Sequence, residues 1–222
     1  MNLKTAHICA ALLFLSPVIG HAEVWAYQDI DPKAPLQYWT GNLGMDFDVV
    51  GNSITVDALG AYKAGTGATG AFSKDIQVGI FNLSGVLQGA VTFTANSTYN
   101  YVVGTNDLYQ QVTPFTLGPG SYSIVAVGFS DLDPNGNYGN GTRPLSTLDT
   151  GGGAIQFVGG SRYDSNTALQ LPGTLDGGPA NRYDAGTFGF TAAPEPGTFA
   201  MLGIGAALLA LARRKISRRS SL

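Results

Sequence analysis

MDFDV at residues 45–49 and ITVDA at residues 54–58 alternate apolar with polar side chains, and this alternation decides the fold. A period of two residues is that of a β-strand with one buried face. IQVGI at residues 76–80 repeats the pattern. We therefore predict three strands, with the aspartates at positions 46, 48 and 57 on solvent-exposed faces.

Turn-forming residues separate these strands from further apolar segments. NLSG at residues 82–85 divides the third strand from residues 86–94, which predicts a hairpin. Gly118-Pro119-Gly120 predicts another turn, before an apolar segment at residues 121–129 that suits a strand buried on both faces. Further strand segments are expected at residues 112–117, 155–158 and 187–191.

The composition supports the same fold class. The 222 residues leave room for one ordinary domain, and the 31 glycines favour tight turns. No part of the central chain keeps apolar residues at helical spacing. We predict an all-β fold, an antiparallel β-sandwich or jelly-roll-like ectodomain at residues 23–192.

The N-terminal segment has the three parts of a secretory signal peptide. Lys4 precedes an apolar run at residues 8–19, and small residues lead to Ala22. We predict a signal peptide at residues 1–22, cleaved by signal peptidase after Ala22. The single cysteine, Cys9, lies within it, so the mature chain would contain no thiol for a disulfide or a metal.

The C-terminal segment has the parts of a short membrane anchor. It begins with the motif Pro194, Glu195, Pro196 and Gly197. An apolar stretch at residues 197–212 predicts one transmembrane helix, roughly 24 Å long against a hydrocarbon core of about 30 Å. The basic tail at residues 213–222 begins with the cluster Arg213, Arg214 and Lys215. This cluster predicts that the tail stays in the cytoplasm and the ectodomain outside.

The sequence PEPGTFAMLGIGAALLALARRK at residues 194–215 closely resembles the PEP-CTERM sorting signal of Gram-negative bacteria, which we place at residues 193–217. The resemblance implies that an exosortase in the inner membrane recognises the Pro-Glu-Pro motif, removes the helix and tail, and passes the protein to the cell surface or matrix. It also implies an association with exopolysaccharide and biofilm. A span that is never cut remains the alternative.

Residues 39–47, 54–60 and 78–81 resemble an ectodomain found on PEP-CTERM proteins. This second resemblance implies a β-sandwich and assigns no catalytic residue. The chemistry of the chain agrees, because its two histidines, at positions 7 and 21, both lie in the predicted signal peptide. Triads that need histidine or cysteine are therefore excluded from the mature chain, and we predict that it is not an enzyme.

Residues 131–137 imitate the first half of a calcium-binding loop. Oxygen-bearing side chains alternate along it, at Asp131, Asp133, Asn135 and Asn137. The second half departs from that pattern, because position twelve is Thr142 instead of glutamate. Calcium is the one cofactor we predict, and a plain loop rich in aspartate and asparagine stays an open alternative.

Charge and aromatic content bear on the binding partner. Residues 23–194 hold six basic and fourteen acidic residues, a net charge of −8, which disfavours nucleic acid. Exposed rings could stack on sugars, whereas buried ones would pack the core. The candidate rings are Trp25, Tyr27, Tyr38, Trp39, Tyr99, Tyr101 and Tyr109.

These observations lead to three functional hypotheses. The first is a non-enzymatic, exosortase-sorted protein of the cell surface or matrix, associated with exopolysaccharide. The second is a calcium-assisted carbohydrate-binding module. The third is a glycan-acting hydrolase that uses a pair of aspartates, because glycosidases need two carboxyl groups held at a set separation.

Overall fold

The computed structural model describes residues 23–29, 36–63, 69–137 and 146–193, with the isolated positions 203 and 205. Between residues 23 and 193 the described chain contains strands, turns and irregular segments but no helix. Every pairing among the described strands is antiparallel. The predicted all-β, antiparallel fold is confirmed.

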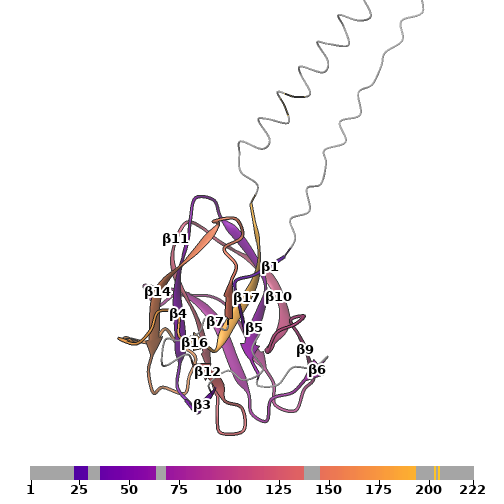
Figure 1. The fold of residues 1–222 in the computed structure, drawn as a ribbon, viewed down its shortest axis with the longest axis vertical. Coiled ribbons are helices and arrows are strands. Elements are labelled where there is room, and N and C mark those ends of the chain that lie inside the picture. Colours follow the sequence, from indigo (N-terminus) through magenta and orange to yellow (C-terminus); the bar gives the residue numbers. More distant parts are fainter. Residues whose placement is uncertain are drawn as a thin grey trace, which may run out of the picture.

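Most described strands belong to two six-stranded sheets (Figure 1). The first has the order β1 (Val24–Trp25), β17 (Gly186–Ala192), β5 (Ile54–Tyr62), β10 (Asp107–Leu117), β9 (Tyr99–Tyr101) and β6 (Thr69–Gly70). The second has the order β15 (Thr174–Leu175), β14 (Ile155–Tyr163), β4 (Leu43–Val49), β11 (Gly120–Val127), β7 (Ile76–Asn82) and β8 (Leu87–Phe93).

Two small sheets complete the described fold. One has the order β16 (Tyr183–Asp184), β12 (Asn135–Asn137) and β3 (Leu36–Gln37), and it lies toward the lower end of the sandwich in Figure 1. The other pairs β13 (Ser146–Leu148) with β2 (Tyr27–Asp29). The sequence alternation did not predict these two- and three-residue strands, because each is too short to show a period.

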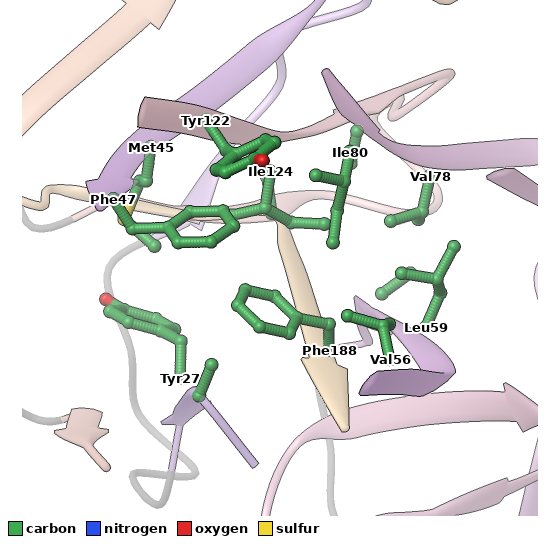
Figure 2. Close-up of a cluster of buried hydrophobic side chains, with 14 of the residues drawn as sticks. Tyr27, Met45, Phe47, Val56, Leu59, Val78, Ile80, Tyr122, Ile124 and Phe188 are labelled. Carbon is green, nitrogen blue, oxygen red and sulfur yellow. The ribbon is translucent and has the colours of Figure 1, made fainter. Parts of the chain in front are cut away.

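The hydrophobic core lies where the two large sheets face each other (Figure 2). Phe47 on β4 meets Phe188 on β17 across the interface, with ring centroids 4.8 Å apart. Tyr122 on β11 stacks on Phe47 from within its own sheet at 5.8 Å. Both phenylalanines are completely buried. The packing of two antiparallel sheets around one core makes the domain sandwich-like, as the sequence predicts.

The predicted strands appear where the alternation placed them. β4, β5 and β7 contain the three alternating segments, and their apolar side chains enter the core. β11 lies between β4 and β7, and its residues 122–127 are all buried. This central position explains why the β11 segment is apolar on both faces.

One of the two predicted turns joins strands of the same sheet, and the other joins strands of different sheets. Residues 82–85 close the β7–β8 hairpin, where Asn82 Oδ1 accepts hydrogen bonds from the backbone N–H groups of Ser84 and Val86. Gly85 has φ of 87°, a left-handed conformation that glycine adopts without strain. The turn at residues 118–120 instead carries the chain from β10 in one sheet to β11 in the other.

Asp46 corrects one expectation from the alternation. It is 4% exposed instead of solvated, and Arg162 Nε donates to both of its carboxylate oxygens at 2.8 Å. Gly160 leaves the necessary space, since a Cβ there would lie 2.7 Å from Asp46 Oδ2. The alternation identifies the outer face of β4 correctly, but it gives no sign that a distant arginine covers that face. Asp48 and Asp57 are only half-buried.

Candidate functional site

The first and last strands of the domain pair with each other. Val24 lies opposite Phe190, and Trp25 lies opposite Gly189. Beyond β17, the backbone N–H of Ala193 donates to the carbonyl of Ser53. The two ends of the domain therefore lie side by side, so segments attached before residue 23 and after residue 193 leave from neighbouring strands.

The predicted processing elements fall outside the described residues. They are Ala22 at the signal cleavage, Pro194, Glu195, Pro196 and Gly197 in the sorting motif, and Arg213, Arg214 and Lys215 in the basic cluster. The predicted span at residues 197–212 is described only at Gly203 and Gly205. Within the described part of the chain, no helix has the length and apolar character needed to cross a membrane.

The predicted calcium segment is divided between two sets of contacts. Asp131 is exposed, whereas Asp133 is 1% exposed and accepts hydrogen bonds from Lys63 Nζ, Ser73 N and Ser73 Oγ. Burial alone would raise the pKa of Asp133, but the hydrogen bonds from Lys63 and Ser73 outweigh burial and hold this pKa below its usual value.

Asn135 and Asn137 lie together on β12, where both amide groups donate to Gln37 Oε1, at 3.3 Å and 2.7 Å. In the ranges that the structure describes, no three or more histidine, cysteine, aspartate or glutamate side chains are grouped so that they could hold a metal ion. Calcium binding by this segment stays a prediction.

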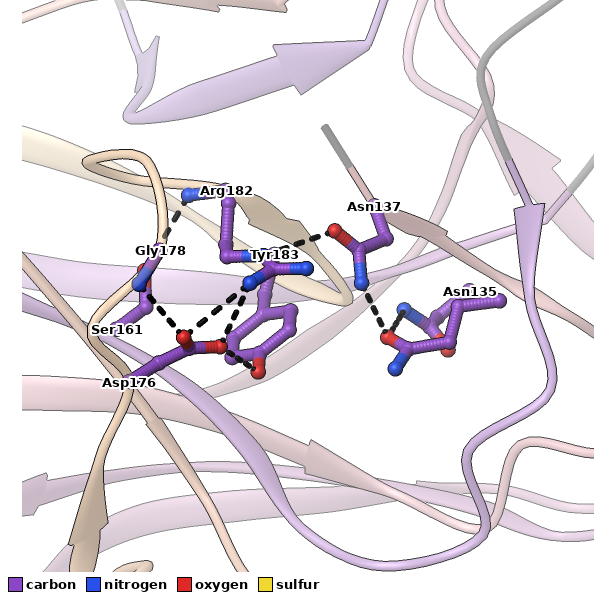
Figure 3. Close-up of polar contacts among 8 residues, drawn as sticks. Asn135, Asn137, Ser161, Asp176, Gly178, Arg182 and Tyr183 are labelled. Atoms are coloured by element: carbon purple, nitrogen blue, oxygen red, sulfur yellow. Dashed lines mark hydrogen bonds and ion pairs between the residues drawn. The ribbon is translucent and has the colours of Figure 1, made fainter. Parts of the chain in front are cut away.

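A polar network extends from β12 to the neighbouring strand β16 (Figure 3). We define it as Gln37, Asn135, Asn137, Asp176, Arg182 and Tyr183. Arg182 Nε donates to Asn137 Oδ1 at 3.0 Å, and its Nη1 donates to both Asp176 carboxylate oxygens at 3.1–3.2 Å. Arg182 also lies over the Tyr183 ring, 5.3 Å from its centroid.

The tyrosine hydroxyl completes the polar network, because Tyr183 Oη donates to Asp176 Oδ2. Burial raises the pKa of Tyr183, and the hydrogen bond to the Asp176 carboxylate raises it further. For Asp176, burial is outweighed by hydrogen bonds from Tyr183 and Gly178 and by the charge of Arg182, so its pKa is lowered. Arg182, Asp176 and Tyr183 therefore form a hydrogen-bonded group whose ionic charges balance.

The candidate aromatic residues separate into buried and exposed groups. Tyr27 is 1% exposed and belongs to the core. Trp25 packs edge-on against Tyr109 at 5.4 Å, and Trp39 packs edge-on against Tyr163 at 5.9 Å. Tyr99 and Tyr101 are half-buried against the core. Only Tyr38, with 64% exposed, presents most of its ring to solvent among these seven residues.

Tyr38 directly follows β3, whose Gln37 accepts the hydrogen bonds from Asn135 and Asn137. An exposed ring thus follows in sequence a residue that binds the buried amides of Asn135 and Asn137. This combination suits a sugar, whose apolar face stacks on a ring while its hydroxyl groups exchange hydrogen bonds with polar side chains. Sequence reasoning singled out Tyr38, Asn135 and Asn137 but missed Arg182 and Asp176. The available signal for Arg182 and Asp176 was their charge, because charged residues make up only 12% of the chain.

The fold defines the class of the domain, an all-β, sandwich-like unit with adjacent termini. Residues 192–219 match the model of the PEP-CTERM protein-sorting motif, which confirms the sorting signal predicted from the sequence. The motif implies an exported protein that an exosortase processes, with membrane-anchored sorting of the type found in Gram-negative bacteria. No curated protein and no solved structure matches the chain.

Proposed function

We propose that this chain is a non-enzymatic protein of the cell surface or extracellular matrix, delivered by exosortase and associated with the exopolysaccharide of its own cell. The sorting motif at residues 192–219 is the observation that carries the proposal. The pairing of β1 with β17 is compatible with it, because both processing segments then join the domain at neighbouring strands.

A matched pair of variants tests the sorting step in a Gram-negative host that contains an exosortase. Glu195→Ala changes the Pro-Glu-Pro motif, and Ser220→Ala changes a residue of the basic tail downstream of the matched region. We expect wild type and Ser220→Ala outside the inner membrane without the tail, and Glu195→Ala retained there at full length. Equal release of all three proteins would contradict the proposal.

Association with polysaccharide is supported by Tyr38 and the neighbouring polar network. The ring is exposed and follows a strand whose Gln37 is held by two asparagines, so its backbone attachment is fixed before any ligand binds. A fixed platform loses less conformational entropy on binding than a mobile one. These observations support a contact surface at Tyr38, directly after β3.

Binding of the purified full chain to the polysaccharide of the producing organism tests this placement. Removing one stacked ring costs about 1–3 kcal/mol, or roughly five- to 150-fold in affinity, by analogy with aromatic stacking on nucleic acid bases. We expect Tyr38→Ala to weaken binding within this range. Val103→Ala is the control, because Val103 is 97% exposed on the loop between β9 and β10. An equal affinity of both variants would exclude the Tyr38 surface.

A calcium-assisted carbohydrate-binding module is the second candidate. One observation favours it, because Asn135 Oδ1 is buried and meets no hydrogen-bond donor in the described chain. An amide oxygen of this kind is a suitable calcium ligand. The same binding assay distinguishes the candidates. Loss of polysaccharide binding in chelator, with recovery in calcium, would favour the module, and binding unaffected by chelator would favour stacking on Tyr38 alone.

The non-enzymatic part of the proposal rests on side-chain chemistry. Residues 23–222 contain neither histidine nor cysteine, the two side chains most used for general base and nucleophilic catalysis near neutral pH. We expect no release of reducing sugar when the protein is incubated with the polysaccharide. Sustained release by wild type, abolished by replacing an aspartate in a variant that still folds, would establish the hydrolase hypothesis instead.

A further inference from the structure

Strand β8 forms one outer edge of the second large sheet. On one side it pairs with β7, in regular register over residues 89–93 and with one register shift nearer the hairpin. On the other side no described strand follows. Apart from the pairing with β7, no backbone group of residues 87–93 has a hydrogen-bond partner among the described residues. Because every second residue of an edge strand directs its N–H and C=O groups away from the sheet, β8 presents a row of backbone groups that another strand could pair with.

The other sheet edges of the described chain are short or interrupted. β15, β1 and β6 form the remaining outer edges, and each has two described residues. β10 extends past β9, but Pro114 removes one of its N–H groups and the pairing with β5 shifts register beside it. β14 extends past β15, but the carbonyls of Gly159 and Ser161 accept hydrogen bonds from the segment that follows β14. The longest uninterrupted open edge in these ranges is therefore β8.

This edge and the strands around it carry no charge. Residues 76–106, which contain β7, β8 and β9, include no aspartate, glutamate, lysine, arginine or histidine. The remainder of residues 23–194 holds all six basic and fourteen acidic residues of that range. The β8 sequence LQGAVTF also lacks proline. Charged side chains and proline are the residues that usually prevent an edge strand from pairing with another chain, and β8 has neither.

Apolar side chains are exposed at the hairpin end of the β8 edge. Leu83, Val86 and Leu87 are 39%, 57% and 47% exposed. Farther along the strand, Ala90 and Thr92 are also exposed. Pairing along β8 would therefore cover apolar surface in addition to satisfying backbone groups. Burial of apolar surface is the main favourable contribution to most protein association.

We propose that β8 is a dimerisation edge, which pairs antiparallel with β8 of a second copy of this chain and joins the two six-stranded sheets into one. The lack of charge selects this occupant. A partner recognised by charge would find no group to pair with along residues 76–106. A second β8 brings no like charges together at the contact, although residues 23–194 of each copy carry a net charge of −8.

Symmetry ends this assembly at a dimer. When two identical strands pair antiparallel, a two-fold axis relates them, so the same edge is covered in both copies. The other described edges are too short or too interrupted to extend the sheet. Membrane-anchored sorting, which the PEP-CTERM motif implies, holds copies in one membrane and raises their local concentration, so a modest affinity is sufficient. The inference does not depend on the proposed polysaccharide contact.

Sedimentation of the full chain in mild detergent, over a range of concentrations, tests the proposal. We expect a monomer–dimer equilibrium for wild type. Residue 90 is the midpoint of β8, so antiparallel pairing brings residue 90 of both copies together. Ala90→Lys should raise the dimer dissociation constant at least about tenfold, because two lysines then meet across the contact. Val103→Lys adds the same charge at a 97% exposed position between β9 and β10 and should dimerise like wild type.

Opposite charges separate the pairing of β8 from a general loss of stability. Ala90→Glu alone should also stay monomeric, whereas an equimolar mixture of Ala90→Lys and Ala90→Glu should form a heterodimer. Thermal unfolding checks that each variant is folded. Amide hydrogen exchange gives a second measurement on wild type. The β8 amides should become more protected as the protein concentration rises, and those of the two-residue edge strand β15 should not change.

Three outcomes would overturn the proposal. The first is a wild type that stays monomeric at every concentration, since β8 would then be open or would serve a different protein. The second is a dimer that Ala90→Lys leaves unchanged, without concentration-dependent protection of β8, because the association would then lie elsewhere in the chain. The third is an equimolar mixture of the two folded charge variants in which no heterodimer forms.

Discussion

The core between the two large sheets and the polar network beside β12 differ in what holds them together. The core consists of apolar side chains such as Phe47 and Phe188, whose burial provides a driving force that does not change with pH. The polar network and the nearby Asp133 depend on ionised groups that must be paired. The fold is therefore insensitive to pH in its middle and sensitive at one end.

The difference also separates two kinds of buried aspartate. Asp133 and Asp176 receive hydrogen bonds from cations and hydroxyl groups, and these contacts lower their pKa values. Asp107 and Asp184 are completely buried beside other carboxyl groups, and burial, followed by the charge of these neighbours, raises their pKa values. The surroundings of a buried carboxyl group thus determine whether acid or alkali weakens the fold.

The largest effect is expected in the core. Phe188 is completely buried and contacts Phe47 and Phe190. Phe188→Ala should lower the free energy of unfolding by about 3–5 kcal/mol, by the same amount at pH 5 and pH 7. Urea unfolding followed by tryptophan fluorescence measures it. Val103→Ala, at an exposed position, should change stability by less than about 0.5 kcal/mol. A loss for Phe188→Ala that varied with pH would remove the contrast between core and polar network.

Breaking the Asp133–Lys63 pair should have the next largest effect. Asp133→Asn should cost roughly 3 kcal/mol at pH 7, the lower end for a buried ion pair, because the Lys63 side chain is 20% exposed and can be hydrated. Asp131→Asn, at the exposed position two residues earlier, is the matched control. Equal stability of the two variants would mean that the Lys63 contact contributes nothing.

Acid should weaken the domain through a different set of aspartates. Asp133, Asp164 and Asp176 have lowered pKa values, so their contribution is present above the unfolded pKa of about 3.9 and is lost as pH falls through the folded values. Thermal unfolding of wild type should show a fall in Tm on the order of 5 °C between pH 5 and pH 3. A Tm that continued to rise below pH 4 would contradict the assignment.

The smallest effect on stability is expected at the candidate binding surface. Tyr38 is 64% exposed, so Tyr38→Ala should change the free energy of unfolding by less than about 0.5 kcal/mol while weakening polysaccharide binding. Measuring stability and binding on the same preparation separates the two. A large loss of stability would mean that the ring supports the fold and that its effect on binding is indirect.

The apolar half of this comparison could be predicted from the sequence because its signals are local. Alternation over five residues each located β4, β5 and β7, and NLSG at residues 82–85 located the hairpin. The sorting signal could be identified for the same reason, since all its parts lie within one short segment. A period of two also indicates which face of a strand is buried, and the core residues followed from it.

The polar half could not be predicted, because its partners are far apart in the sequence. Arg162 reaches Asp46 and Arg182 reaches Asn137, while Asp184 interacts with Asp29 and Asp107. The calcium-like spacing of residues 131–137 suggested one local group of ligands. In the structure Asp133 bonds Lys63 and Ser73, whereas Asn135 and Asn137 both bond Gln37, so the predicted ligands contact different neighbouring segments.

Sorting to the exterior determines where the whole domain, with its core and its polar network, acts. The most direct test is the intact mass of the protein recovered from the producing cells. The account predicts a chain that begins at Glu23, lacks residues 213–222 and is found outside the inner membrane. A full-length chain that keeps residues 213–222 and stays in the inner membrane would contradict it.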